Sequence, residues 1–401
     1  MKEQKVKISE MVRHNPVFLF LFLLCIGTSI GFQGWRTLFN NFAIEEVGLN
    51  GFNIGAIQSL REIPGFLSLA VVFLLLFIQE KRLIIISCTF LALGVILTGF
   101  LPSFTGLLMT TFIMSLGFHY FETTNQSITL QNFSQKESPF VLANLKSVVA
   151  FSNIFAGGLI FILSNHLNYS TNYTILGLIV LLFIITAFIK TPRNCSPIPQ
   201  NKNIVLKKKY WLFYVLNFLS GARRQIFVVF AVLLMVEKYN FTIAQVSVLF
   251  ILNNIIAIFT NPIIARLINN FGEKTTLRIE YSALAIIFFS YAYFDSPIIA
   301  ASLYIFDHIF FNFSIGIRTY FQKHADPKDI APSMAAGFTI NHIAAVILPF
   351  IGGMVWLINW RIPFIAAVVL CFISLGFIQF MKPYKSCENI PMKNIKKTKT
   401  F

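Results

Sequence analysis

Residues 16–43 read PVFLFLFLLCIGTSIGFQGWRTLFNNFA and contain no charged side chain before Arg36. About 20 consecutive, mostly apolar residues are enough for an α-helix to cross the hydrocarbon core of a bilayer. The run is too long for the apolar part of a secretory signal peptide, and no small-residue cleavage site follows it. It therefore predicts a first membrane-spanning helix that is retained in the mature protein.

Eleven further apolar runs follow along the 401-residue chain. Hydrophobic residues make up 56% of the sequence and charged residues only 12%, whereas a soluble domain usually carries about 25% charged residues. We therefore predict an all-α integral membrane protein with twelve transmembrane helices. The predicted spans are residues 16–43, 52–78, 82–101, 105–132, 139–164, 170–190, 210–236, 242–268, 275–294, 297–322, 331–357 and 360–381.

Basic residues lie mainly in alternate connections between these spans. Of the 32 Lys and Arg residues, we assign 24 to the side of the two termini, counting those at helix ends, and six to the membrane interior, while only Lys238 and Arg361 are assigned to the other side. Cytoplasmic connections of membrane proteins carry an excess of Lys and Arg. We therefore predict a multi-pass protein of a bacterial cytoplasmic (inner) membrane with both termini in the cytoplasm. This bias also explains the net charge of +16, so no nucleic-acid partner is expected.

The longest polar stretch between spans divides them into two sets of six. We predict an N-terminal six-helix bundle at 1–190, a cytoplasmic linker at 191–209, a C-terminal six-helix bundle at 210–381 and a basic cytoplasmic tail at 382–401. The two bundles repeat features in the same order: Arg36 and Arg224, for example, precede a Phe-Ala pair by the same distance. Parallel six-helix repeats are the plan of one large class of transporters.

A loop motif between the eighth and ninth spans adds to this pattern. Residues 265–274 read ARLINNFGEK and include Asn269, Gly272 and Lys274. They resemble the Gly-x-x-x-Asp-x-x-Gly-Arg-Lys/Arg signature of the major facilitator superfamily, with Asn269 in place of the family's Asp. The other copy of this signature, between the second and third spans, is reduced to QEKR at residues 79–82.

Two more stretches are similar to a poorly characterised bacterial branch of this superfamily. They are residues 61–67, REIPGFL, and residues 333–345, SMAAGFTINHIAA. The resemblance covers essentially the full length of the chain. It implies two six-helix repeats around a central cavity lined by helices one and seven. It also implies a transporter that works by alternating access, and not an enzyme.

Arginines within predicted helices are the first candidates for a substrate site. An ionisable side chain at the bilayer centre is costly unless it faces protein or water, so such residues mark functional positions. Arg36 and Arg224 lie at repeat-related positions of helices one and seven, although Arg36 could instead reach the outer headgroups. Adjacent residues point about 100° apart on a helix, so only one of Arg223 and Arg224 is expected to face the cavity, and the repeat favours Arg224. The other substrate-binding candidates are Asn341 and His342.

Acidic and histidine side chains within the spans are candidates for carrying protons. Glu122 and His119 are three residues apart and therefore share one helix face, and Asp307 is the second carboxylate candidate. A poorly solvated carboxyl group can exchange a proton near neutral pH. The alternatives are a packing role for His119 and ion pairs for Glu122 and Asp307. A further predicted pair, Arg61–Glu62, acts either as a gate or as a structural unit.

Three acidic residues, Glu62, Glu122 and Asp307, are assigned to the membrane interior together with six basic ones, which are Arg36, Arg61, Lys146, Arg223, Arg224 and Arg318. Such an excess favours an anionic solute, because guanidinium groups bind carboxylates and phosphates in bidentate fashion. We predict proton-coupled transport of a small organic anion, such as a polycarboxylate or a carboxylate siderophore. The alternatives are efflux of amphiphilic drugs by proton antiport and, less favoured, a membrane receptor or scaffold. No cofactor, nucleotide site or metal cluster is expected, and the chain is predicted to act as a monomer in the lipid bilayer.

Overall fold

The computed structural model describes residues 8–49, 51–164, 166–190, 200–201, 206–241 and 243–382. Within these residues all regular elements are helices, and no strand occurs. The longer helices are α2 (Pro16–Glu45), α3 (Gly51–Phe66), α5 (Glu80–Thr98), α6 (Phe104–Asn132), α7 (Ser138–Ser164), α8 (Tyr169–Lys190), α9 (Trp211–Ile226), α10 (Ile243–Tyr293), α11 (Pro297–Phe311), α13 (Ile330–Ile358) and α14 (Arg361–Ile378). The shorter elements are α1 (Ile8–His14), α4 (Ala70–Leu74), α12 (Ile315–His324), the 3-10 turns η1 (Leu67–Leu69), η2 (Lys208–Tyr210), η5 (Asn312–Ser314) and η6 (Pro327–Asp329), and the π-helical turns η3 (Phe227–Ala231) and η4 (Leu234–Lys238).

The predicted spans coincide with helical segments to within a few residues. The first begins at Pro16, where Asn15 Oδ1 accepts hydrogen bonds from the backbone N–H groups of Val17 and Phe18 at 3.0 Å. An Asn cap followed by Pro is a favoured start for a helix. Ten helices in the described part of the chain are long and apolar enough to cross a membrane. The protein is therefore a multi-pass membrane protein.

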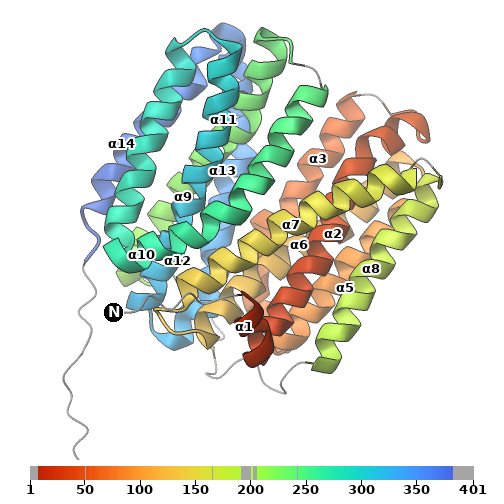
Figure 1. Ribbon diagram of the computed structural model, residues 1–401, viewed down its shortest axis with the longest axis horizontal. Coiled ribbons are helices and arrows are strands. Elements are labelled where there is room, and N and C mark those ends of the chain that lie inside the picture. Colours follow the sequence, from red (N-terminus) through yellow and green to blue (C-terminus); the bar gives the residue numbers. More distant parts are fainter. Residues whose placement is uncertain are drawn as a thin grey trace, which may run out of the picture.

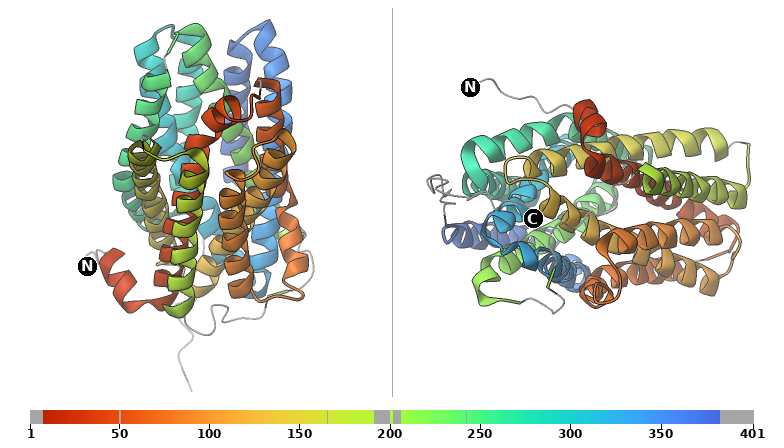
Figure 2. Two further views of the ribbon diagram at one scale, coloured as in Figure 1. Left: turned by 90° about the vertical axis from the view of Figure 1, so that its right-hand side faces the viewer. Right: turned by 90° about the horizontal axis from the view of Figure 1, so that it is seen from below.

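The helices form two groups that lie side by side (Figures 1 and 2). We call helices α1 to α8 the N-terminal half and helices α9 to α14 the C-terminal half. Each half has its own hydrophobic core: one cluster is built around Trp35 and Phe39, and another around Phe230 and Phe364. Helices α7 and α10 pack against each other where the halves meet, as Figure 1 shows. The interface between the halves is therefore the place to look for a site.

Polar contacts join the halves from their lower end in Figure 1 towards the middle. At the lower end, Gln322 Nε2 donates to the carbonyl oxygens of Leu130 at 2.7 Å and Phe133 at 2.8 Å. Nearer the middle, Ser147 Oγ on α7 lies 3.2 Å from the carbonyl oxygen of Ile258 on α10. These hydrogen bonds hold the two halves together at the end that carries the α6–α7 and α12–α13 connections.

The loop motif of residues 265–274 lies inside α10 and makes a sharp break. Gly272 has φ +77° and ψ 163°, so α10 is two helices joined at a kink. Asn269 Nδ2 donates to the carbonyl oxygen of Lys136 in the N-terminal half at 2.7 Å. Lys274 Nζ donates to the carbonyl oxygens of Gln379, at 2.9 Å, and Met381, at 3.3 Å. With Asn in place of the expected Asp, the motif thus still connects the two halves.

Gly272→Ala is expected to lower the apparent melting temperature of the purified protein. The backbone conformation of Gly272 is essentially restricted to glycine, and forcing another residue into it costs about 1–3 kcal/mol. An added Cβ would meet no atom within 4 Å, so the loss reports backbone strain alone. Gly158→Ala, also in open space but inside α7, is the control and should leave stability unchanged or slightly raised. Equal effects of the two substitutions would contradict the assignment.

The described parts of the predicted linker are fixed to the C-terminal half through Asp329, at the lower end. Lys207 Nζ and Tyr210 Oη each donate to the Asp329 carboxylate at 2.6 Å, and Asn201 donates to it as well. Burial alone would raise the pKa of Asp329, but these hydrogen bonds outweigh it and hold the pKa below its ordinary value. The remaining linker residues and the predicted basic tail, residues 191–199, 202–205 and 383–401, lie outside the described residues.

Candidate functional site

The α-helical geometry of α3 ends within the stretch 61–67. Pro64 lacks the N–H needed for a helical hydrogen bond, and the 3-10 turn η1 follows directly after Phe66. In η1 the backbone N–H of Leu69 donates to Thr339 Oγ1 of α13 at 2.8 Å. Helix α13 packs against both α3 and η1. The stretches 61–67 and 333–345 therefore meet across the boundary between the two halves.

Two histidine side chains fill the space next to Gly65 at this meeting point. A Cβ atom on Gly65 would stand 2.7 Å from His342 Nε2 and 3.0 Å from His119 Cε1. The two imidazole rings are nearly perpendicular, at 85°, with their centroids 4.9 Å apart. His119 comes from α6 in the N-terminal half and His342 from α13 in the C-terminal half. Only glycine lets both rings approach the α3 backbone this closely.

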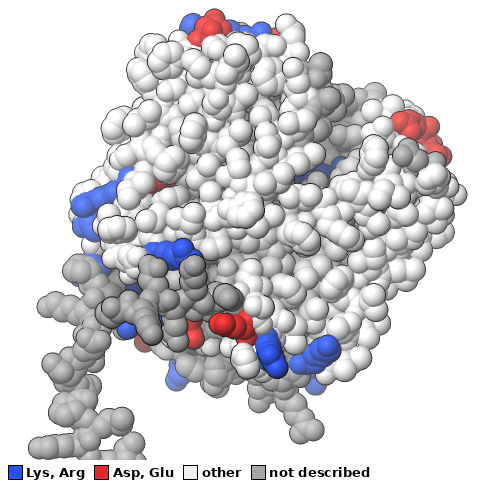
Figure 3. Space-filling view, viewed as in Figure 1, with Lys and Arg blue, Asp and Glu red and all other residues white. Residues whose placement is uncertain are grey.

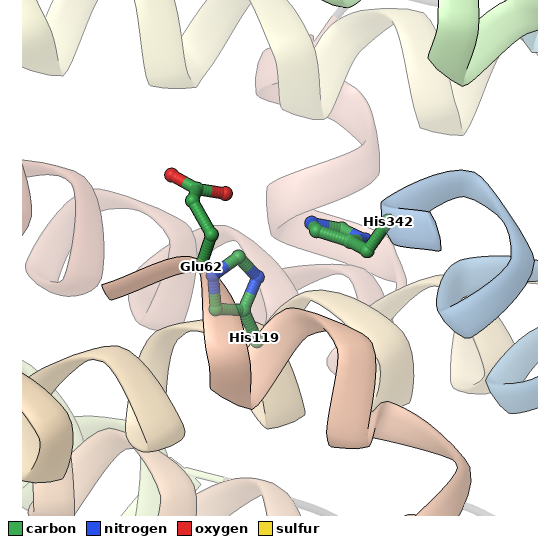
Figure 4. A group of neighbouring side chains, drawn as sticks. All are labelled: Glu62, His119 and His342. Atoms are coloured by element: carbon green, nitrogen blue, oxygen red, sulfur yellow. The ribbon is translucent and has the colours of Figure 1, made fainter. Parts of the chain in front are cut away.

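Glu62 completes this group of side chains (Figure 4). One possible ligand atom from each of Glu62, His119 and His342 lies within 4.8 Å of the other two. The predicted pair is present: Arg61 donates to Glu62 Oε1 from Nη2 at 2.8 Å and from Nε at 3.3 Å. Two imidazoles and one carboxylate are donors that suit a transition-metal ion. No metal site was expected from the sequence, because these residues lie on three different helices.

Arg61→Gln and Glu62→Gln are each expected to destabilise the protein more than the double substitution does. Each single change leaves one charge in a site where the side chains are only 21% and 27% exposed. Charged groups in direct contact typically show coupling energies of about 0.5–3 kcal/mol. Melting temperatures of the four proteins of this double-mutant cycle measure the coupling. Simple additivity of the two single effects would show that the pair is neither a structural unit nor a gate.

Arg36 and Arg224 expose their side chains although both lie within membrane-spanning segments. They are close enough to interact electrostatically with each other, and Arg36 also interacts with Arg61. Arg224 interacts further with His119 and His342. In Figure 3 the surface is hollowed between the halves, and atoms of basic residues are visible in the hollow. The structure thus brings one arginine of each half to the same region as the histidine pair.

Arg223, the neighbour of Arg224, is enclosed within the C-terminal half. Its side chain is 1% exposed, and its guanidinium carbon lies 4.1 Å from the centre of the Tyr281 ring. Arg223 donates to Ser374 Oγ and approaches Glu280 Oε1 at 3.9 Å. A side chain held in this way cannot reach a solute between the halves. This placement favours a structural role for Arg223 over the predicted substrate-binding role.

Two carboxylates accompany Arg223 inside the C-terminal half. Glu280 on α10 is completely buried, and Asp307 on α11 is 1% exposed. Arg223 interacts electrostatically with both, and Asp307 Oδ1 has no hydrogen-bond partner among the described residues. Asp307, a predicted proton carrier, is thus buried near Arg223. Sequence reasoning missed Glu280, although an acidic residue within an apolar run was a visible signal.

Glu122 lies on α6, three residues after His119, and it is half-buried. It forms no ion pair with the described residues, but it interacts electrostatically with Lys146 and Arg318. Lys146 is fixed by a hydrogen bond to Asn312 Oδ1 in the other half at 2.9 Å. Glu122 therefore has basic groups nearby without being locked to one of them, as a group that exchanges protons requires.

Asn341 has a packing role in this structure. Its side-chain Nδ2 donates to the carbonyl oxygen of Asn217 on α9 at 3.0 Å. A Cβ atom on Gly221 of α9 would stand 2.9 Å from the Asn341 side chain, so the two helices are in close contact there. Asn341 therefore joins α13 to α9, while the ring of its neighbour His342 lies against that of His119.

Comparison with known proteins gives a family. A sequence model of the Major Facilitator Superfamily matches twice, over residues 24–344 and 213–394. No curated protein matches the sequence.

Solved structures of very low sequence identity share the fold. The human organic anion transporter MFSD10 (TETRAN) is 13% identical, with a TM-score of 0.72 over 91% of this chain and 99% of that one. The E. coli fucose:proton symporter FucP is 16% identical, with a TM-score of 0.72 over 92% and 98% of the two chains. A bacterial homologue of the iron transporter ferroportin, in an outward-facing state, is 12% identical, with a TM-score of 0.74 over 90% and 98%. The chain belongs to the Major Facilitator Superfamily and is a membrane transporter, not an enzyme.

Proposed function

We propose that the protein is a secondary transporter of a small organic anion. The observation that carries this proposal is the pair of exposed arginines, Arg36 and Arg224, that lie near each other on opposite halves. Arginine binds carboxylate and phosphate groups in a planar, bidentate geometry. Moving the halves changes the distance between the two guanidinium groups, so an anion held by both would respond to that movement.

The charge balance around the hollow supports an anionic solute. Arg36, Arg61 and Arg224 interact with one another or with the histidine pair, and Lys146 and Arg318 interact with Arg224. Among the described residues, three carboxylates interact with these five basic residues: Glu62, Glu122 and Glu280, the last through Lys146. Asp307 is buried within the C-terminal half. An uncompensated positive charge in a poorly hydrated site attracts anions and repels cationic drugs.

The transport cycle follows from this arrangement and from the loop charges. We infer twelve membrane spans, with the two parts of α10 on either side of Gly272 counted separately and α13 included. The Lys and Arg bias places the lower end of Figure 1 in the cytoplasm. Since the polar contacts of Gln322 and Asn269 join the halves at that end, the state described here is open to the outside. Alternating access then requires these contacts to break.

Glu122 is proposed as the proton-carrying carboxylate. Glu122→Gln preserves shape and hydrogen bonding but removes the ionisable group, so we expect it to stop accumulation driven by a pH gradient while exchange of solute continues. The measurement compares gradient-driven uptake with counterflow in vesicles. Glu46→Gln, the same change at an exposed carboxylate at the C-terminal end of α2, is the matched control. Accumulation by Glu122→Gln with unchanged pH dependence would exclude this residue from coupling.

The proposed function is tested with inside-out and right-side-out membrane vesicles. Uptake of a panel of radiolabelled mono-, di- and tricarboxylates and organic phosphates is measured with and without a pH gradient. We expect saturable transport of at least one anion that requires Arg224. Extrusion of lipophilic cations without any anion transport would overturn the proposal and favour drug efflux.

A further inference from the structure

We propose that Glu62, His119 and His342 together bind one divalent transition-metal ion between the two halves. The inference goes beyond the proposed anion transport, because it assigns a second kind of ligand to a neighbouring part of the same hollow. The site combines two helices of the N-terminal half, α3 and α6, with α13 of the C-terminal half. Its ligand atoms already lie within 4.8 Å of one another.

The histidine pair is prepared for metal binding by its hydrogen bonds. His342 Nδ1 lies 2.9 Å from the Phe338 carbonyl oxygen, which assigns the ring proton to Nδ1 and leaves the lone pair on Nε2. Metal-binding histidines usually donate their other ring N–H to a carbonyl or carboxylate in this way. A Cβ atom on Gly65 would stand closest to Cδ2 and 2.7 Å from Nε2 of His342, so the ring edge that carries this lone pair lies next to Gly65.

His119 supports the metal site independently of His342. Its side chain is only 6% exposed, and its Nδ1 has no hydrogen-bond partner among the described residues. A buried polar atom without a partner costs about 1–3 kcal/mol. A metal ion coordinated by this ring would remove that cost by filling the coordination site or by reorienting the imidazole.

The chemistry of the three ligand groups determines which metal ions the site would prefer. Two imidazoles and one carboxylate suit Zn²⁺, Co²⁺, Ni²⁺ and Fe²⁺, whereas Mg²⁺ and Ca²⁺ prefer oxygen ligands. Arg61 uses only Oε1 of Glu62 for its two hydrogen bonds, so Oε2 takes part in neither. Ligand atoms on a tetrahedral ion are about 3.3 Å apart at metal–nitrogen distances near 2.0–2.1 Å. The three groups must therefore close by up to about 1.5 Å, which draws α13 towards α3 and α6.

The basic residues around the site determine which further ligand would complete the coordination of the metal ion. Arg61, Arg36 and Arg224 would repel a bare cation, but three protein ligands leave at least one coordination position open. An anion attracted by Arg36 and Arg224 can occupy that position and neutralise the ion. This part of the inference rests on the proposed function: the transported anion and the metal would then bind next to each other.

The test is Co²⁺ binding to protein purified without a polyhistidine tag. CoCl₂ is titrated into detergent-solubilised protein, and binding is followed by calorimetry and by the visible d–d absorption of tetrahedral Co²⁺. We expect one high-affinity site. His119→Gln, His342→Gln and Glu62→Gln should each lower the affinity about 100-fold or more, because losing a ligand exceeds the roughly 10–100-fold effect of losing an outer hydrogen-bond partner. His308→Gln, a half-buried histidine of α11 outside the group, is the matched control and should bind normally.

Two further variants separate this inference from its alternatives. Gly65→Ala keeps all three ligands but pushes a Cβ against His342 Nε2, and it should also weaken binding. Arg224→Ala keeps the ligands as well and should bind Co²⁺ at least as tightly as the unmodified protein. Normal anion transport by Arg224→Ala together with intact Co²⁺ binding would refute the proposed function alone.

The metal site itself is overturned by either of two results. The first is a Co²⁺ affinity that is unchanged in His119→Gln and His342→Gln, which would assign any binding to surface groups. The second is an absence of Co²⁺ binding combined with an altered pH dependence of transport in His119→Gln. That second result would make the same three residues a proton-carrying group.

Discussion

Arg224→Ala is expected to abolish transport while leaving expression and membrane insertion close to normal. The Arg224 side chain is exposed, and its guanidinium carbon lies 5.9 Å from the centre of the Phe311 ring. Its removal therefore leaves no buried partner unpaired. The loss of one bidentate, charge-assisted contact to the anion should lower transport to background, as measured by initial uptake rates at saturating solute.

Arg224→Lys is the informative companion to this substitution. Lysine keeps the charge but not the planar pair of donors, so we expect weaker binding with partial transport. Full activity of the lysine variant would show that only charge is needed at this position. Normal transport by Arg224→Ala would remove Arg224 from the substrate site.

Arg223→Met is expected to have the opposite phenotype, a large loss of stability. Arg223 is the cation that the buried carboxylates of Glu280 and Asp307 interact with. Removing one partner of a buried charged group typically costs about 3–5 kcal/mol, since a charge is left without compensation. The apparent melting temperature in detergent should fall far more than in Arg224→Ala, and little folded protein should be recovered from membranes.

The double variant Arg223→Met/Glu280→Gln tests the physical reason. Removing the Glu280 charge together with the arginine should restore part of the lost stability, because fewer buried charges remain uncompensated. A stable Arg223→Met protein that has lost only transport would contradict the structural role. It would return Arg223 to the substrate site.

The contrast between Arg223 and Arg224 shows what could not be predicted from the sequence. Both arginines lie in an apolar run, and both could be identified as functional markers from the cost of charge in a bilayer. Which one is exposed depends on how α9 is rotated about its axis, and α9 packs mainly against α13 and α14. Ser374 of α14 and Tyr281 of α10 enclose Arg223.

The sequence by itself determined the class of protein and the helical segments. Each membrane span must satisfy its own backbone hydrogen bonds in lipid, so hydrophobicity over about 20 residues is enough to locate it. The helix start at Asn15-Pro16 and the break at Gly272 are likewise local features. The family could be identified because its loop motif is also a short, contiguous stretch.

Only the tertiary structure decided which side chains act together. Glu62, His119 and His342 are far apart in the chain and meet because α3, α6 and α13 cross at Gly65. Asp307, for which proton carrying and an ion pair were both predicted, is buried near Arg223 and the overlooked Glu280. Hydrophobic patterning fixes which segments enter the membrane but leaves their rotation and pairing open. Those are set by side-chain packing between helices, to which residues from the whole chain contribute.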